Sequence, residues 1–506
     1  MSFIKILESI VGKGTIVQTH ASEVLIQDEF VYKVKKPVYF GFLDFRTLKQ
    51  RRAYCILEKE LNSRFSKGIY LQVLKLIKTG EGYRLDDVSS SLPAVEYVVK
   101  MKRVPKGAFM DKHIEQRLMD DEKMYAVGYD TALLFKKLPV SAELVEDMDA
   151  FQIVAFNCRE NFTQMNETAP EFVDWRFKFV RDVTEKFLIE HENLFRKRYS
   201  EGYVKDGHGD LRAEHLFFTD GRLEIIDCID FNERFRTNDI VSEAVFLAME
   251  FDYMGMLSFA DAFMEGFLSV FNDDDSRFLL NFYKCYRAVV RAKVAMFSIQ
   301  AMTKASPEYI DKMAEFHRLA DMAVTYALTL LGRPLVFCGM IGTGKSVSAY
   351  NFEKRFPVRN IGTDEVRKRM AGLEVKESAV APVYEGLYTP EKSKAVYCEL
   401  GRLARKALAE GRLPLLDGTF LKKEYRELFE AELGAKPYYI LFTASDEVIL
   451  KRLEARAGVA SATDGRSQHF EALKAYAAEL PEPDYIVDTM TRSDIEEIMR
   501  NLVADA

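Results

Sequence analysis

The sequence predicts a mixed α/β protein with more than one domain, and three observations support this fold class. The chain has 506 residues, which is more than a single hydrophobic core ordinarily holds. Short apolar runs with strand character alternate with helical stretches in residues 1–110 and again after residue 334. A glycine-rich segment, residues 339–346, lies between a strand-like run and a helical run. We therefore expect an N-terminal α+β region and a C-terminal parallel α/β sandwich.

The N-terminal region is predicted to hold a small sheet followed by a mainly helical segment. The β-type runs are Glu23–Ile26, Phe30–Lys35, Tyr70–Ile77 and Ala94–Met101, and Phe45–Phe65 has helical spacing. Helical patterns dominate from about residue 111 to 200 and from 238 to 331, and turn signals and apolar runs separate them at 207–230.

The main boundary is predicted at Gly332-Arg333-Pro334, because glycine and proline interrupt the helical pattern there. Beyond it, the expected strands and helices alternate, which is typical of a parallel sheet covered by helices. The strands are 335–338, 413–416 and 437–443, and the helices are 391–410 and those beginning at 345 and 446. The expected division is residues 1–104, 105–331 and 332–506.

Composition excludes several classes of protein. The formal charge is −7 from 71 basic and 78 acidic residues, which argues against broad affinity for nucleic acid. No apolar run approaches the roughly 18 residues of a membrane span, so no membrane partner is expected. The start of the chain lacks the pattern of a signal peptide. The six cysteines form no Cys-x-x-Cys pair, which favours reduced thiols in a cytoplasm and a metal held by oxygen ligands.

The glycine-rich segment has the spacing of a phosphate-binding loop. It reads Gly339-Met340-Ile341-Gly342-Thr343-Gly344-Lys345-Ser346 and matches G-x-x-x-x-G-K-[ST] at every fixed position. The glycines allow the backbone N–H groups to turn towards phosphates, and the following helix adds its positive N-terminal end. Lys345 is expected to reach the β- and γ-phosphates, and the Ser346 hydroxyl to bind Mg²⁺. The predicted ligands are therefore ATP and Mg²⁺.

Further residues are expected along the carboxyl edge of the same sheet. Asp417 ends a short apolar run, as a second Mg²⁺-binding position requires, although an ordinary strand-end aspartate is the alternative. Asp364 and Arg367 follow the predicted strand Val358–Ile361, at the edge where substrates bind in open α/β folds. Arg452 and Arg456 are four residues apart on a predicted helix.

In these residues the C-terminal region resembles the small P-loop kinases, the group of gluconate kinase, zeta toxin and polynucleotide kinase. The resemblance implies that Asp364 accepts a proton from the substrate hydroxyl, and that Arg367 contacts the substrate. It also implies that Arg452 and Arg456 stabilise charge on the transferring phosphoryl group. Solvated surface positions are the alternative interpretation for the acid and the arginines.

A second constellation lies upstream, where His208-Gly209-Asp210 is followed by His215 and by the strand-like run Leu223–Asp227. The segment resembles the catalytic segment of aminoglycoside-phosphotransferase and choline-kinase-like enzymes, which implies a bilobal, protein-kinase-like N-terminal domain. By position, Asp210 corresponds to the catalytic base and Asp227 to the principal metal ligand. His215 stands where the family has a metal-binding Asn, and neutral imidazole is a poor ligand for Mg²⁺.

The start of the chain agrees with this resemblance. Lys33 lies on a strand and corresponds to the phosphate-pairing lysine of the family, with Glu58 on the next helix as its expected partner and Glu60 as the alternative. The alternative interpretation is that Lys33 is a solvated strand lysine and Glu58 an acid on the helix surface. Residues 12–14, Gly-Lys-Gly, are the best candidate for a loop over the phosphates.

A basic helix forms the last candidate site. Arg287 and Arg291 lie at helical spacing within residues 283–293, and guanidinium groups bind phosphate or carboxylate well. These arginines would line an acceptor pocket for an anionic substrate, or equally an ion-paired face between domains.

The whole chain resembles bacterial fusions of an aminoglycoside-phosphotransferase-like domain with an AAA-type ATP-binding domain. That group name describes domains and implies no settled substrate. Lys345, Asp364 and Asp417 motivate the hypothesis of an ATP-dependent kinase whose P-loop domain phosphorylates a hydroxyl on a sugar, nucleotide or related metabolite. Three alternatives stay open: a two-kinase enzyme in which Asp210 is also catalytic, an N-terminal pseudokinase sensor, and a nucleic-acid end kinase. The sequence identifies neither the acceptor nor an oligomeric state.

Overall fold

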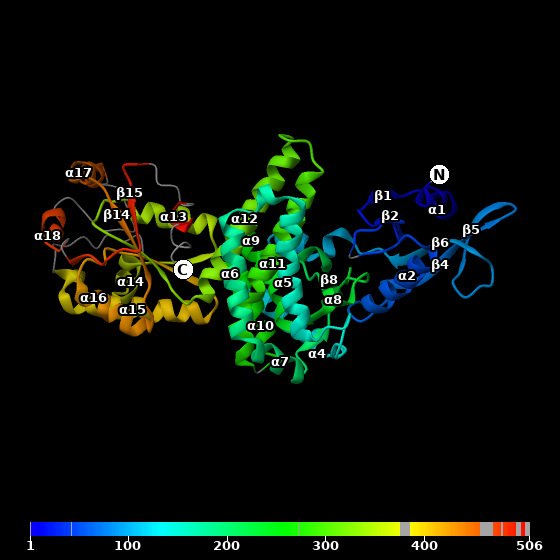
Figure 1. The fold of residues 1–506 in the computed structure, drawn as a ribbon, viewed down its shortest axis with the longest axis horizontal. Coiled ribbons are helices and arrows are strands. Elements are labelled where there is room, and N and C mark those ends of the chain that lie inside the picture. Colours follow the sequence, from blue (N-terminus) through cyan, green and yellow to red (C-terminus); the bar gives the residue numbers. More distant parts are fainter. Residues whose placement is uncertain are drawn as a thin grey trace. The chain divides into compact units, whose positions relative to one another are not determined.

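The computed structural model describes residues 2–500 apart from 42, 272, 375–384, 456–468, 477–478 and 492–496. The chain forms two compact units (Figure 1). The first unit comprises residues 1–157, 191–251 and 256–273, and the second comprises 158–190, 252–255 and 274–506. The predicted mixed α/β fold class is confirmed. Residue 331, where the middle domain was expected to end, falls inside the second unit. The expected three-domain division stays a prediction.

The first unit contains an antiparallel sheet whose described strands follow the order β1-β2-β3-β6-β4-β5. The strands are β1 (Thr15–Gln18), β2 (Ser22–Ile26), β3 (Phe30–Lys35), β4 (Tyr70–Thr79), β5 (Gly82–Asp87) and β6 (Ala94–Lys102). Side chains alternate between its faces. Val98 packs with α1 (Phe3–Val11), whereas Val99 packs with Cys55 of α2 (Leu48–Asn62). The sheet therefore lies between two helices.

Helix α2 begins at a defined signal in the sequence. Thr47 accepts a hydrogen bond from the Gln50 N–H, and the Gln50 side chain accepts one from the Thr47 N–H, which is a capping box. The β1–β2 turn is Thr19-His20-Ala21 and contains no glycine, and residues 12–14 lie between α1 and β1 instead. The Gly-Lys-Gly candidate therefore lies outside the β1–β2 turn, and its role over the phosphates stays a prediction.

The rest of the first unit is built from helices and two small antiparallel pairs. The pairs are β7 (Val204–Asp206) with β10 (Thr237–Asp239), and β8 (Leu216–Thr219) with β9 (Arg222–Ile225). The helices are α3 (Met110–Glu115), α4 (Asp121–Lys136), α7 (Glu192–Ser200), α8 (Glu233–Arg236), α9 (Ile240–Tyr253) and α10 (Leu257–Leu268). Helices α4 and α10 cross at Gly128 and Gly266, where a Cβ on either glycine would overlap a backbone carbonyl of the opposite helix.

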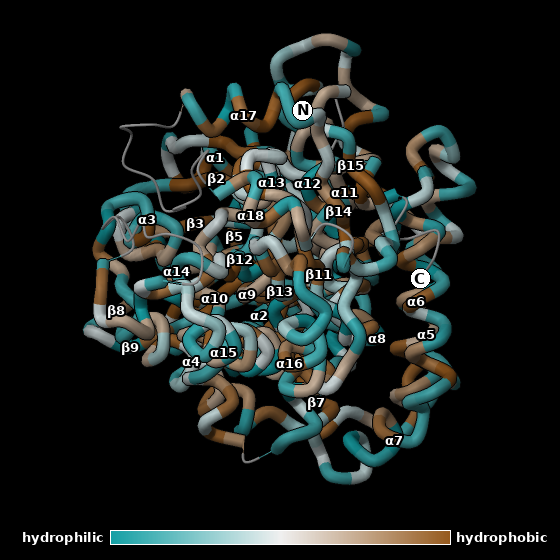
Figure 2. The backbone as a smooth tube through the Cα atoms, turned by 90° about the vertical axis from the view of Figure 1, so that its left-hand side faces the viewer, coloured by the Kyte–Doolittle hydropathy of each residue, from teal (hydrophilic) through white to brown (hydrophobic). Residues whose placement is uncertain are grey.

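The second unit begins with long helices whose hydrophobic and hydrophilic stretches alternate (Figure 2). They are α6 (Trp175–Glu190), α11 (Asp274–Gln300), α12 (Pro307–Leu330) and residues 158–168 of α5 (Ala150–Thr168), whose first residues belong to the first unit. Asp252 is buried in this unit and accepts hydrogen bonds from Arg412 Nη1 at 2.6 Å, Lys284 Nζ at 2.9 Å and Tyr326 Oη at 2.7 Å. This network ties helices α11 and α12 to the residue just before strand β13.

The second unit also contains a parallel sheet, in which the described strands follow the order β12-β13-β11-β14-β15. The strands are β11 (Leu335–Cys338), β12 (Val358–Gly362), β13 (Leu413–Asp417), β14 (Tyr438–Thr443) and β15 (Tyr485–Asp488). The remaining helices are α13 (Lys345–Arg355), α14 (Thr363–Met370), α15 (Pro390–Ala409), α16 (Lys423–Leu433), α17 (Asp446–Ala455) and α18 (Phe470–Lys474). The predicted strands and helices of this region are confirmed, with ends shifted by a residue or so.

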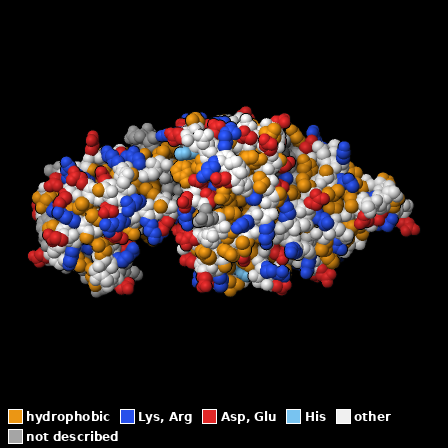
Figure 3. Space-filling model, turned by 90° about the horizontal axis from the view of Figure 1, so that it is seen from below, with side chains coloured by type: hydrophobic (Ala, Val, Ile, Leu, Met, Phe, Trp, Pro, Cys, Tyr) orange, Lys and Arg blue, Asp and Glu red, His pale blue; other side chains and the backbone are white. Residues whose placement is uncertain are grey.

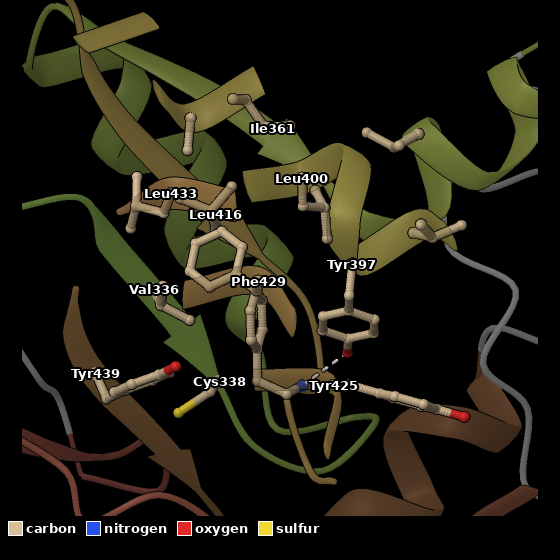
Figure 4. Packing of buried hydrophobic residues seen from close by; sticks show 14 residues of the cluster. Val336, Cys338, Ile361, Tyr397, Leu400, Leu416, Tyr425, Phe429, Leu433 and Tyr439 are labelled. Atoms are coloured by element: carbon tan, nitrogen blue, oxygen red, sulfur yellow. Dashed lines mark hydrogen bonds between the residues drawn. The ribbon is translucent and has the colours of Figure 1, made fainter. Parts of the chain in front are cut away.

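Both faces of the parallel sheet are covered. Val336 faces a cluster with Leu400 of α15 and Phe429 of α16 (Figure 4), whereas its neighbour Phe337 makes an edge contact with the Phe352 ring of α13. Tyr397 of α15 also accepts a hydrogen bond from the Phe420 N–H in this cluster. Burial on both faces explains why the strands read as continuous apolar runs.

Acidic and basic side chains are interspersed over the face of the protein in Figure 3. Within the described ranges, no helix is long and apolar enough to span a bilayer. All six cysteines are free thiols.

Candidate functional site

The first candidate site begins with an ion pair between β3 and α2. Lys33 Nζ lies 2.8 Å from Glu58 Oε1 and 3.1 Å from Asp227 Oδ1. Burial alone would lower the pKa of Lys33, but the carboxylates of Asp227 and Glu58 outweigh it and raise the pKa well above its ordinary value. Lys33 also holds the pKa of Asp227 below its usual range. The structure thus pairs Lys33 with Glu58, and not with Glu60.

A second lysine of the same strand completes this cluster. Lys35 is two residues from Lys33, so its side chain lies on the same face of β3. Lys35 Nζ lies 2.8 Å from Glu58 Oε2 and also pairs with Asp230. Glu58 is therefore shared by two lysines, which fixes the position of α2 against β3. A lysine pair at i and i+2 on one strand was the signal in the sequence.

The segment with Asp210 is held by buried groups on both sides. His208 Nε2 donates to the Ile226 carbonyl at 2.9 Å, and its Nδ1 accepts from the Asp210 N–H at 3.3 Å. Burial, with a contribution from His215, lowers the pKa of His208 to about 4. The ring is therefore neutral at pH 7 and serves to position the backbone at Asp210.

Glu243 of α9 is a supporting residue that sequence reasoning also missed. Its Oε1 and Oε2 accept from the Gly209 N–H at 2.9 and 3.0 Å, and Asn238 Nδ2 donates to Oε1 at 3.0 Å. A Cβ at position 207 would overlap the Glu243 carboxylate, which explains Gly207. An acid within the apolar helical run 240–251 was the available signal.

Asp227 follows β9 in a left-handed backbone conformation with φ of 63°. Its N–H donates to Tyr70 Oη at 3.2 Å, which supports this conformation from β4. The Asp227 side chain is 55% exposed. His215 Nδ1 lies 2.7 Å from the Asp210 carbonyl, and His215 Nε2 lies 3.9 Å from Asp227 Oδ2. The structure therefore brings Asp210, His215 and Asp227 together.

These residues fit Mg²⁺ only in part. The Asp227 carboxylate is a suitable hard oxygen ligand, but the group beside it is an imidazole instead of an amide oxygen. Among the described residues, no group of three or more His, Cys, Asp or Glu side chains is arranged to hold a metal ion. A metal at this site would therefore need ligands from elsewhere, and we derive no catalytic step through Mg²⁺ here.

The second candidate site is the loop between β11 and α13. Gly339, Gly342 and Gly344 have φ values of 127°, 77° and 100°, which residues with a side chain rarely adopt. Lys345 lies at the start of α13, and its Nζ donates to the Met340 carbonyl at 2.7 Å and approaches Thr343 Oγ1 at 3.5 Å. Ser346 follows on the same helix. The loop therefore has the backbone that the motif predicts.

Two acids lie at the carboxyl ends of adjacent strands beside this loop. Asp417 ends β13 opposite Phe337 of β11 and Gly362 of β12. Asp364 lies in the first turn of α14, directly after β12, and its Oδ1 accepts a hydrogen bond from Tyr388 Oη at 3.4 Å. The ends of three neighbouring strands thus bring the loop and both acids to one edge of the sheet.

Arg367 lies one helical turn from Asp364 on α14. It is buried, its Nη1 donates to the Leu387 carbonyl at 2.8 Å, and its guanidinium lies over the Tyr388 ring at 4.4 Å. Within the described part of the chain, its Nε has no hydrogen-bond partner. The residue is therefore not the solvated arginine of the alternative interpretation.

Arg452 of α17 lies against the glycine-rich loop. Its Nη1 donates to Thr489 Oγ1 at 2.8 Å and approaches the carbonyls of Gly342 and Thr343 at 3.4 Å. These contacts hold α17 to the loop. Arg456 lies outside the described residues.

The arginines of the basic helix lie on α11 in the second unit. Arg287 is buried beside the Tyr286 ring, at 5.3 Å from its centre. Arg291 Nη2 pairs with Glu315 Oε1 of α12 at 3.1 Å. Arg291 thus forms an ion pair within the second unit, and both the acceptor site and the face between domains stay predictions.

The fold and the two sites define a mixed α/β protein in which an antiparallel sheet carries the Lys33–Glu58 pair and a parallel sheet carries the glycine-rich loop. Residues 335–480 match the family described as "AAA domain". The chain is 29% identical over 448 residues to uncharacterized proteins of Mycobacterium tuberculosis and Mycobacterium bovis, covering 87% of this chain and 86% of theirs. The C-terminal region is accordingly similar to AAA-type ATP-binding domains.

Solved structures of low identity are similar to part of the chain. The choline kinase LicA of Streptococcus pneumoniae is 15% identical with a TM-score of 0.38, covering 65% of this chain and 98% of its own. A gluconokinase from Sinorhizobium meliloti 1021 is 18% identical with a TM-score of 0.23, covering 34% of this chain and 90% of its own.

Proposed function

We propose that the P-loop domain transfers the γ-phosphoryl group of ATP to a hydroxyl group of a small molecule, such as a sugar, nucleotide or related metabolite. The observation that carries the proposal is the position of Lys345, Asp417 and Asp364 along one edge of the parallel sheet, at the ends of β11, β13 and β12. A nucleotide on the loop and an acceptor beside Asp364 would then share that edge.

Each residue of this edge has a role in the proposed reaction. Lys345 exchanges its contact with the Met340 carbonyl for the β- and γ-phosphates, where its positive charge opposes the charge of the transferring group. Asp364 accepts the proton of the acceptor hydroxyl as the new oxygen–phosphorus bond forms. The bond between the γ-phosphorus and the bridging oxygen breaks, and ADP leaves. Arg452 holds α17 against the loop and stabilises the same charge, with Arg456 as its proposed companion.

The oxygen donors of Ser346 and Asp417 suit Mg²⁺, which would neutralise phosphate charge when bound. On the acceptor side, Arg367 supports an acceptor with a polar or anionic group, because its buried Nε is available to donate a hydrogen bond within the described residues. Tyr388 Oη, which contacts Asp364, would hold the carboxylate in place before the proton is transferred.

A screen of metabolite pools with labelled ATP tests the proposal. Wild type, Lys345→Ala, Asp364→Asn and Asp210→Asn are compared on the same pools. We expect a labelled product with wild type and Asp210→Asn, none with Lys345→Ala, and a rate reduced by about 10²–10⁴-fold with Asp364→Asn. Full phosphotransfer by Lys345→Ala would contradict the proposal.

A second candidate function is phosphoryl transfer at the N-terminal site with Asp210 as the base. The observation that favours it is the formed cluster of Lys33, Glu58 and Asp227. In the same screen, this function requires that Asp210→Asn removes a product that Lys345→Ala retains. If Asp210→Asn changes no product, the N-terminal domain acts as a pseudokinase sensor that binds a ligand without chemistry.

A further inference from the structure

His215 presents a ring nitrogen to carboxylate oxygens at the N-terminal site. Its Nδ1 lies 2.7 Å from the Asp210 carbonyl, which can only accept, so Nδ1 carries the proton of this hydrogen bond. In the neutral ring, Nε2 is then an acceptor. Nε2 lies 3.9 Å from Asp227 Oδ2 and 3.9 Å from Glu214 Oε1. Acceptors facing one another at this spacing favour a cation between them.

The spacing of Nε2 and Asp227 Oδ2 suits one shared metal ion. Metal–nitrogen and metal–oxygen bonds of about 2.0–2.2 Å allow a bent bridge across the observed separation. The other carboxylate oxygen, Oδ1, is oriented by Lys33 at 3.1 Å. The His215 ring is oriented by the Asp210 carbonyl, and its side chain is only 10% exposed. Such outer contacts fix the direction of a metal ligand.

Glu214 is a weaker candidate ligand. Its side chain is 51% exposed and is paired with Arg212, which also pairs with Glu250. A site that depends on two rigid protein ligands therefore rests on His215 and Asp227. The described residues contain no group of three ligating side chains, so the proposed site takes its other ligands from nucleotide phosphate oxygens and water.

We propose that the N-terminal site binds a divalent transition-metal ion between His215 Nε2 and Asp227 Oδ2, together with a nucleotide, in place of Mg²⁺. Imidazole suits transition metals, whereas Mg²⁺ prefers oxygen ligands and gives up its waters reluctantly. A site with one imidazole and one carboxylate therefore discriminates against Mg²⁺. The proposal is independent of the chemistry proposed for the P-loop domain.

The test uses the full chain with Lys345→Ala throughout, so that the P-loop contributes little nucleotide binding. Mn²⁺ is titrated with and without ADP, and free Mn²⁺ is followed by electron paramagnetic resonance. Mg²⁺ and Co²⁺ then compete for the site. Pulsed measurements detect coupling of the bound Mn²⁺ to ¹⁴N, and labelling the histidines with ¹⁵N assigns that coupling without any substitution. His215→Asn is the test variant, and His113→Asn makes the same chemical change on α3.

We expect one Mn²⁺ bound per chain only when ADP is present, with a nitrogen coupling that changes on histidine labelling. Co²⁺ should displace Mn²⁺ more readily than Mg²⁺ does, following the order of metal affinity for nitrogen ligands. His215→Asn should remove the coupling and reduce the preference for Mn²⁺ over Mg²⁺ by about tenfold or more, while His113→Asn changes neither. Absence of bound Mn²⁺, bound Mn²⁺ without histidine coupling, or an unchanged preference in His215→Asn would overturn the proposal.

Discussion

Glu243 accepts the Gly209 N–H with both of its carboxylate oxygens, at 2.9 and 3.0 Å, from a helix that begins more than thirty residues later in the chain. The contact fixes the backbone immediately before Asp210. The Gly209 N–H and the Glu243 carboxylate are both buried. Water therefore has little access to this N–H if the carboxylate is removed.

Replacing Glu243 by alanine should loosen the Asp210 segment. The loss of a charged acceptor for a buried N–H costs about 1.5–3 kcal/mol, so we expect faster hydrogen exchange at residues 207–212. Glu122→Ala, an exposed acid of α4, serves as the matched control and should leave that exchange unchanged. Equal exchange in wild type and Glu243→Ala would show that the contact does not hold the segment.

Asp252 should be a strong determinant of stability in the second unit. Asp252→Ala removes the carboxylate that Arg412, Lys284 and Tyr326 share, and breaking a buried pair costs about 3–5 kcal/mol. The single tryptophan, Trp175 on α6, belongs to this unit, so its fluorescence reports the unit's thermal transition. Asp446→Ala breaks the exposed pair with Lys474 and should cost less than about 1 kcal/mol. Similar shifts in both variants would contradict this prediction.

The Asp252 network should also give the second unit a dependence on acid. Burial favours the neutral acid, but Arg412 and Lys284 outweigh it and lower the pKa of Asp252. An aspartate whose pKa is lowered on folding stabilises the folded protein at pH values above its unfolded pKa of about 3.9. This stabilisation is lost as the pH falls through the pKa of the folded state. The difference in thermal unfolding temperature between wild type and Asp252→Asn, followed by Trp175 fluorescence, should therefore be largest above about pH 5. It should become smaller below about pH 4. A gap that stays constant down to pH 3, or that narrows at alkaline pH, would refute this assignment.

Local patterns in the sequence were enough for the strands beside the phosphate loop and for the loop itself. The run Leu335–Cys338, the glycines and Lys345 are adjacent in the chain, so one short segment specifies strand, loop and helix. The lysine and glutamate of the first site were also accessible, since each lies on an element with a clear pattern. Strand β1 was missed because it is short and mostly exposed, so burial gives it little apolar periodicity.

The residues that sequence reasoning missed act across long separations. Glu243, Asp230 and Asp252 each contact a partner from another element, and the sequence marks them only as acids beside apolar residues. Nothing local distinguishes a buried acid that holds a backbone N–H or an arginine from one at a helix surface. The same limit applies to Arg291, where helical spacing alone left a substrate site and an ion pair equally open.

The crossing of α4 and α10 should tolerate no side chain at its glycines. Gly266→Ala places a Cβ against the Tyr125 carbonyl, so the helices must separate. We expect the free energy of unfolding to fall by about 1–3 kcal/mol. This loss outweighs the gain of about 1 kcal/mol from the higher helix propensity of alanine relative to glycine. Gly80→Ala lies in the turn between β4 and β5 with nothing near its Cβ, and it serves as the control. Thermal unfolding checks both, and a more stable Gly266→Ala would show that the crossing can relax.

The two sites together predict two nucleotides per chain. Lys33 and Lys345 each lie where a phosphate would gain a charge-assisted hydrogen bond worth about 1.5–3 kcal/mol. Replacing either lysine should therefore lower the affinity of its own site for ADP by about tenfold to a hundredfold. Isothermal titration with ADP should give two sites in wild type, one strong site in Lys33→Met or Lys345→Ala, and none in the double variant. Lys49→Met and Lys354→Ala alter exposed lysines of α2 and α13 and should keep both sites. If Lys33→Met retains two strong sites, the N-terminal cluster is a structural ion pair that does not bind phosphate. If Lys345→Ala retains two strong sites, the glycine-rich loop does not bind the nucleotide through its lysine.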